Sequence, residues 1–281
     1  MAAVALSFLA SMSWGLADFM AGLKSRRLGV LTVLAWVEAV GLIVVMTVIV
    51  ATAEPLPDQR TLIYSVIAGA AGVTALGSFY KALSVGTMSI VAPISATGVM
   101  LPVIVGLASG DTLTLLIGIG MVAAVAGVLM ASREEVDELE HGGPNRTAIL
   151  LALGAALGFG TYFTFADVAA DGSVLWLLAA GRVVALPFIL TLLVRSGAPL
   201  RPTRTDAWQL GLIGCADLAA TALYGLATKK GELSIVAVVG SLYPVVTVLL
   251  ARGVLKERIS RLQAAGVGLA LAGVLLVSAG G

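Results

Sequence analysis

The chain has 281 residues, of which 59% are hydrophobic and 12% are charged, with 17 Lys and Arg against 16 Asp and Glu. A soluble domain usually carries about 25% charged residues, and a mean hydropathy of +1.05 leaves too little polar surface to face water. The balanced charge argues against nucleic acid as a partner. The single Cys and single His argue against a disulfide framework or a Cys- or His-rich metal site. We therefore predict a membrane protein, and we expect it to hold no metal or cofactor.

Long apolar blocks, rather than short segments of alternating polarity, favour helices over a β-barrel. A helix needs about 20 apolar residues to cross ~30 Å of hydrocarbon. Blocks of this length predict an all-α integral membrane protein with ten transmembrane helices, at 2–22, 30–52, 61–83, 88–108, 112–131, 147–167, 173–195, 206–228, 233–252 and 260–279. The first block has no basic residue before it, so we interpret it as a retained span and not as a signal peptide.

An acidic, Gly- and Pro-containing segment at 133–146 interrupts the apolar pattern near the middle of the chain and is typical of a linker. It separates a first repeat, 1–132, from a second repeat, 147–281. Short matches recur between the halves at an offset of 145 or 146 residues, including Ser89–Ala92 with Ser234–Ala237 and Ala126–Leu129 with Ala272–Leu275. The pattern predicts an internal duplication, with helices 1–5 in one repeat and helices 6–10 in the other.

An odd number of helices in each repeat has a consequence for orientation. The second repeat must enter the membrane from the opposite side, which gives the inverted repeats found in many secondary transporters. The loops after spans 1, 5, 7 and 9 carry 12 Lys and Arg, whereas those after spans 2 and 8 carry three. Because basic loops stay in the cytoplasm, this count predicts that both termini face outward.

Several short motifs resemble those of the drug/metabolite transporter superfamily, specifically its ten-helix EamA-type permeases with two EamA repeats. They are Trp14-Gly15 with Phe19, Phe79–Leu83, Ser241–Pro244, Leu255–Ser260, Gly266 and Ala272–Leu276. The resemblance implies that the first four helices of each repeat surround a central cavity, with helices 5 and 10 outside it. It also implies transport of small metabolites, amino acids or drugs, often outward and commonly coupled to protons. Relatives with ten helices are often drawn with both termini in the cytoplasm, against the charge count.

Charged residues inside a bilayer are costly and usually face a cavity or a partner. Lys81 and Asp167 lie near span ends, where they reach water without a function. Asp18 and Asp217 are candidates for proton coupling or for binding charge, and Asp217 has no basic residue one helical turn away. Glu38 and Arg182 lie well inside spans 2 and 7, at nearly equivalent repeat positions. Three arrangements are open: a fixed ion pair that holds the halves in register, a gate that opens and closes during transport, or no contact between the two.

Aromatic residues gather where the walls of a cavity are expected, because an apolar body with a polar tip suits a ligand pocket. Packing between helices, or a belt of aromatic residues at the membrane interface, is the alternative for them. The candidates for the wall of a substrate cavity are Trp14, Phe19, Tyr80, Tyr162, Phe163, Tyr224 and Tyr243.

These features predict a secondary transporter in the inner (plasma) membrane that exports a small metabolite, amino acid or drug-like solute by alternating access, with proton coupling as an option. No nucleotide-binding or hydrolase motif supports an enzyme. An enzyme acting on lipid-linked substrates, or a sensor or scaffold without transport, are the alternatives. The expected partners are a small molecule and the lipid bilayer, and a homodimer is left open.

Overall fold

The computed structural model describes residues 1–281 except 86–93, 96, 132–145, 198–201, 256–259 and 281. The side chains of a few helical residues, Tyr80 and Pro244 among them, also lie outside the described part of the chain. The predicted linker, 133–146, therefore lies outside the described residues apart from Arg146. So does the start of the fourth predicted span.

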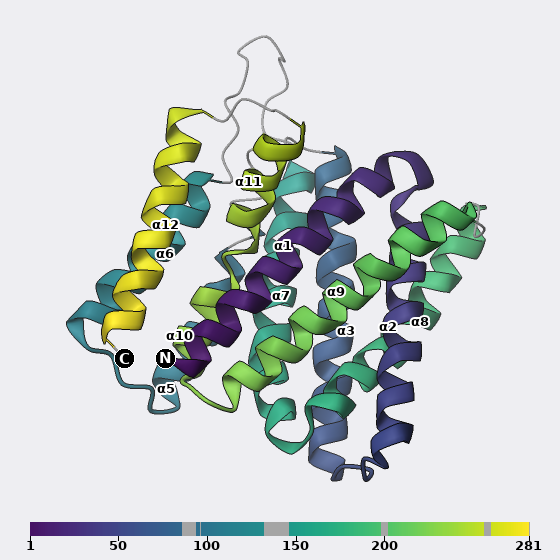
Figure 1. Ribbon diagram of the computed structural model, residues 1–281, viewed down its shortest axis with the longest axis horizontal. Coiled ribbons are helices and arrows are strands. Elements are labelled where there is room, and N and C mark those ends of the chain that lie inside the picture. Colours follow the sequence, from purple (N-terminus) through teal and green to yellow (C-terminus); the bar gives the residue numbers. More distant parts are fainter. Residues whose placement is uncertain (86–93, 96, 132–145, 198–201, 256–259, 281) are drawn as a thin grey trace.

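All the regular elements of the described residues are helices (Figure 1). The first half contains α1 (Ala2–Leu28), α2 (Val30–Thr52), α3 (Gln59–Val85), η1 (Thr97–Val99), α5 (Met100–Ala108) and α6 (Leu115–Ala131). The second half contains α7 (Arg146–Gly172), α8 (Val174–Ser196), α9 (Arg204–Thr228), α10 (Leu233–Gly240), α11 (Tyr243–Leu255) and α12 (Arg261–Gly280). An all-α fold is what the apolar blocks predict.

Six of the described helices are long and apolar enough to cross a membrane: α1, α2, α3, α7, α8 and α9. The apolar segments Thr97–Ala108, Leu115–Ala131 and Arg261–Val277 are shorter. Large apolar side chains lie exposed on the outside of the bundle, as at Leu115 (82%), Val194 (80%) and Leu275 (70%). A surface of this kind is suited to lipid and not to water.

Polar residues at the corners set where several helices begin. Ser173 accepts a hydrogen bond from the Trp176 amide at 3.3 Å and caps α8. The Asp58 carboxylate accepts one from the Thr61 amide at 2.9 Å at the start of α3. Hydrogen bonds from Thr61 hold the pKa of Asp58 below its usual value. Such caps satisfy amides that have no partner within their own helix.

The ninth predicted span, 233–252, is not one continuous helix. α10 ends at Gly240, the Leu242 amide turns back to the Val239 carbonyl at 3.3 Å, and α11 begins at Tyr243. Pro244 has no N–H to continue the ladder of helical hydrogen bonds. The single span predicted at 233–252 is therefore two helices in the structure.

Helices of the first half pack against helices of the second half. The most extensively packed pairs are α6 with α12, α3 with α7, α1 with α9, α3 with α8, and α2 with α8. The pair of α6 and α12 stands beside the main bundle in Figure 1. A Cβ on Gly127 would lie 2.7 Å from the Gly266 carbonyl oxygen, and one on Gly120 would lie 2.8 Å from that of Gly273. These glycines let the two backbones touch, as small residues do in membrane helix pairs.

Candidate functional site

Arg182 lies well inside α8 and brings together charged residues from both halves of the chain. Its Nη2 donates a hydrogen bond to Asp217 Oδ2 on α9 at 2.7 Å. Its Nη1 donates to the Leu178 carbonyl at 3.2 Å. Its Nε lies 3.7 Å from Glu38 Oε2 on α2. Arg182 therefore bridges a carboxylate of the first half and a carboxylate of the second.

Asp217 has a basic partner, although none is near it in sequence. The partner comes from the neighbouring helix α8, which sequence spacing alone does not reveal. The closer contact of Arg182 is with Asp217 and not with Glu38, the residue expected at a nearly equivalent repeat position.

Gly41, which sequence reasoning did not single out, provides the space in which Arg182 lies. A Cβ at Gly41 on α2 would overlap Nε of Arg182. Glu38 and Gly41 are three residues apart and so share a face of α2. A glycine one turn from a charged residue within a span is the signal in the sequence that points to this slot.

The first helix adds a third carboxylate and a hydrogen-bond donor. The Trp14 side chain lies beside Asp217, and Asp18 lies close enough to Asp217 for their charges to repel. We call Asp18, Glu38, Arg182 and Asp217 the central polar cluster. The side chains of Asp217 and Glu38 are 28% and 18% exposed, against 7% for Arg182. The carboxylates of Asp217 and Glu38 are therefore partly accessible, whereas the Arg182 side chain beside them is buried.

Aromatic rings pack beside this cluster. Trp14 lies 5.7 Å from both Phe163 and Tyr224, Phe163 lies 5.0 Å from Tyr224, and Tyr162 lies 5.3 Å from Phe163, all between ring centroids. We call these four residues the aromatic wall. The hydroxyl of Tyr224 is fully buried without a hydrogen-bond partner.

The structure places the other aromatic candidates differently. Tyr243 is the first residue of α11, and it lies close enough to Asp18 for the two side chains to interact electrostatically. Phe19 is buried on α1. Tyr80 belongs to α3, but its side chain lies outside the described residues.

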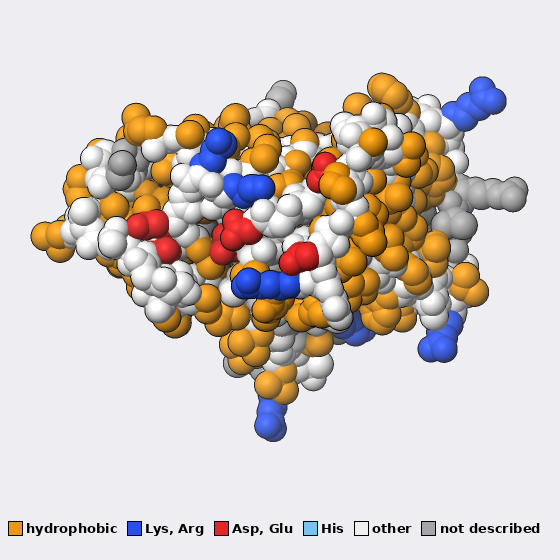
Figure 2. Space-filling view, turned by 90° about the horizontal axis from the view of Figure 1, so that it is seen from below, with side chains coloured by type: hydrophobic (Ala, Val, Ile, Leu, Met, Phe, Trp, Pro, Cys, Tyr) orange, Lys and Arg blue, Asp and Glu red, His pale blue; other side chains and the backbone are white. Residues whose placement is uncertain are grey.

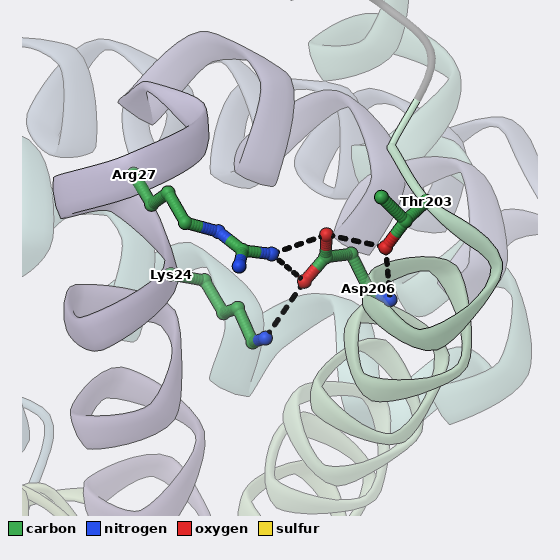
Figure 3. A network of polar contacts seen from close by, with 4 residues as sticks. All are labelled: Lys24, Arg27, Thr203 and Asp206. Atoms are coloured by element: carbon green, nitrogen blue, oxygen red, sulfur yellow. Dashed lines mark hydrogen bonds and ion pairs between the residues drawn. The ribbon is translucent and has the colours of Figure 1, made fainter.

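One end of the bundle is held by ion pairs between α1 and α9 (Figure 3). Asp206, 1% exposed, pairs with Lys24 at 2.9 Å and with Arg27. The Thr203 hydroxyl donates to Asp206 Oδ2 at 2.6 Å, and the Asp206 amide donates to Thr203 Oγ1 at 3.2 Å. The two halves are therefore joined here by charge.

The opposite end, where both termini lie, carries a band of acidic and basic side chains (Figure 2). Asp111 Oδ2 accepts a hydrogen bond from the Ser234 amide at 2.9 Å in the first turn of α10. Glu232 Oε1 accepts bonds from the amide and hydroxyl of Thr112 at 3.0 and 2.9 Å. These contacts join the α5–α6 loop of one half to the start of α10 in the other.

Comparison with known proteins decides the family. The EamA-like transporter family matches residues 1–133 and again residues 146–279. The chain belongs to this family. The predicted resemblance to EamA-type permeases with two repeats is confirmed. This chain is accordingly a multi-pass membrane protein of a transporter family, and a small molecule is its expected partner.

Solved structures support the same fold. One crystal structure, titled only as that of a protein, is 17% identical over 98% of both chains and superposes with a TM-score of 0.78. Among curated protein sequences, none matches significantly.

Proposed function

We propose that this EamA-family protein is a secondary transporter that binds a small organic solute at the central polar cluster. The observation that carries the proposal is Arg182, which lies between a carboxylate of each half, bonded to Asp217 at 2.7 Å and 3.7 Å from Glu38. Charged groups at such depth are costly unless they serve a pathway or a site. A site shared by both halves is sensitive to their relative movement, which alternating access requires.

The proposed architecture is ten transmembrane helices in two inverted repeats, 1–132 and 147–281. Cross-pairing of the halves supports it, because α1 packs on α9 while its repeat-mate α7 packs on α3. The break between α10 and α11 supports it too, since transporter sites are often formed at interrupted helices. Tyr243, at the start of α11, lies beside Asp18 of the cluster.

We propose further that Asp217 takes part in proton coupling, that transport runs outward, and that the protein lies in the inner (plasma) membrane. The partial exposure of Asp217 supports the first point, because a coupling carboxylate must reach water as well as its partner. Glu38 and Arg182 then form the contact that breaks and re-forms between states.

The test is transport into proteoliposomes. The purified protein is reconstituted, and uptake of radiolabelled amines, amino acids, sugars, nucleosides and aromatic drugs is measured with and without an imposed pH gradient. At least one class is expected to move, and Asp217→Asn should abolish the dependence on the gradient while leaving the protein folded. Asp171→Asn, an exposed carboxylate on α7, is the matched control and should transport normally. No movement of any solute, under every gradient, would refute the proposal.

A further inference from the structure

The central polar cluster has more negative than positive groups. Asp18, Glu38 and Asp217 contribute three carboxyl groups, and Arg182 contributes one guanidinium. Tyr162 on α7 and Tyr243 on α11 are the titratable neighbours that are close enough to sense these charges. With all four charged residues ionised the cluster carries an excess of two negative charges inside an apolar bundle, and a structure with that excess is stable only when protons or a cation balance it.

Arg182 contacts Asp217 much more closely than it contacts Glu38. Its Nε is buried without a hydrogen-bond partner and lies 3.7 Å from Glu38, too far for a bond. A structural arginine of this depth usually has its donors satisfied by a carboxylate or carbonyl. Because Gly41 has no side chain, the guanidinium packs directly against the backbone of α2.

The aromatic wall next to the carboxylates indicates which chemical class of ligand the site would bind. Trp14 lies beside Asp217 and packs against Phe163 and Tyr224. A carboxylate beside aromatic faces is the arrangement that recognises organic cations, through charge pairing and cation–π attraction. An inorganic cation would instead need several oxygen ligands, and the described residues contain no group of three or more Asp, Glu, His or Cys placed to hold a metal.

We propose that the central polar cluster takes an organic monocation, a protonated amine or quaternary ammonium with an apolar group, which competes with Arg182 for Asp217. The inference rests on the proposed transport function and gives its substrate class. In the absence of substrate, Arg182 pairs with Asp217. When the organic cation binds, it takes the place of Arg182 at Asp217, and Arg182 moves toward Glu38. The exchange keeps Asp217 next to a positive charge in both states, and the bound cation lowers the negative excess of the cluster by one.

The first test uses four probes of nearly equal size and different charge: benzylammonium, benzyltrimethylammonium, benzyl alcohol and benzoate. Binding to the detergent-purified, full-length protein is measured by isothermal titration calorimetry near neutral pH. Both cations should bind at least about tenfold more tightly than the alcohol and the acid, because only they gain the charge pair. Tighter binding of benzoate, which would make Arg182 the ligand, overturns the proposal, as does equal binding of all four.

The second test separates competition from structural support. Asp217→Asn should weaken both cations about tenfold or more. Arg182→Gln, in contrast, should strengthen cation binding several-fold, because the competing positive charge is gone. A merely structural Arg182 predicts the opposite, a loss of binding. Arg195→Gln, an exposed arginine in the last turn of the same helix, is the control and should bind as the parent does.

Gly41→Ala provides a second variant if Arg182→Gln does not fold. The added methyl overlaps Nε and displaces the guanidinium, so it should also change the affinity for the cations and leave that for benzyl alcohol alone. If the protein transports neutral or anionic solutes and ignores the two cations, the substrate class is wrong and the transport function stands. If it binds the cations without transporting any solute, the transport function is wrong instead.

Discussion

Gly15 on α1 and Gly160 on α7, 145 residues apart, make the same close contact in the two halves of the molecule. A Cβ on Gly15 would lie 2.7 Å from the Tyr243 carbonyl oxygen and 2.5 Å from Val246 Cβ. One on Gly160 would lie 2.5 Å from the Gly98 carbonyl oxygen and 2.8 Å from Leu101 Cβ. Their contact residues are again 145 apart, so the internal repeat extends from the sequence to individual contacts.

We expect Gly15→Ala and Gly160→Ala each to destabilise the protein, by about 1–3 kcal/mol, because the methyl has no space against backbone and side chain. The measurement is the thermal unfolding temperature in detergent. Gly118→Ala on α6 is the control, since nothing lies within 4 Å of its Cβ position, and it should unfold at the parent temperature or above. An unchanged unfolding temperature for Gly15→Ala would mean that α1 and α11 separate easily.

At the α1–α9 end, Asp206→Asn should loosen the two halves. The amide keeps the shape of the side chain, but it loses the charge that pairs with Lys24 and Arg27. Spin labels at Gly22 and Arg204 in a Cys215→Ala background should report a longer and broader distance distribution by electron–electron double resonance. Asp58→Asn, on the loop between α2 and α3, should leave the distribution as it is. If Asp206→Asn leaves the distance distribution unchanged, the ion pairs of Asp206 do not hold α1 and α9 together.

At the end that carries the termini, Asp111→Ala should destabilise α10. It removes the carboxylate that accepts from the Ser234 amide, a loss that typically costs about 1 kcal/mol at a helix start. Hydrogen exchange of residues 233–240 should become faster, whereas Asp171→Ala should leave it unchanged. Exchange at the parent rate would show that Glu232 and Thr112 hold this end without Asp111.

Trp14→Ala and Tyr243→Ala should weaken solute binding, seen as a higher KM in the proteoliposome assay, while the variants still insert and fold. Both residues lie next to the carboxylates of the central polar cluster. Trp208→Ala is the aromatic control, because Trp208 is 69% exposed on the same helix as Asp217. Parent-like KM values in both variants would assign these rings to helix packing alone.

The orientation of the chain follows from its basic loops. With 12 Lys and Arg on one side and three on the other, both termini should face outward. Alkaline phosphatase fused after Gly281 should be active, and the same enzyme fused in the α8–α9 loop should be inactive. A stable but inactive C-terminal fusion places the termini in the cytoplasm instead.

The sequence by itself determined the helical class, the family and most helix positions. Apolar length is a local property, so α2 begins and ends where its block predicted, and α8 lies within one residue of its block. The duplication was readable for a similar reason, since two repeats of one fold place the same small and apolar residues at the same offset. The linker and the Tyr80 side chain lie outside the described residues, so their predictions stay predictions.

Only the tertiary structure decided which charges meet. Asp217 and Arg182 are 35 residues apart, and the rotation of α8 against α9, which sets their contact, depends on the packing of many side chains at once. The slot at Gly41 exists because α2 passes Arg182 closely, and the division of the ninth predicted span after Gly240 is visible only in the structure. Composition and periodicity describe one helix at a time, whereas the candidate site is formed by side chains from α1, α2, α7, α8, α9 and α11.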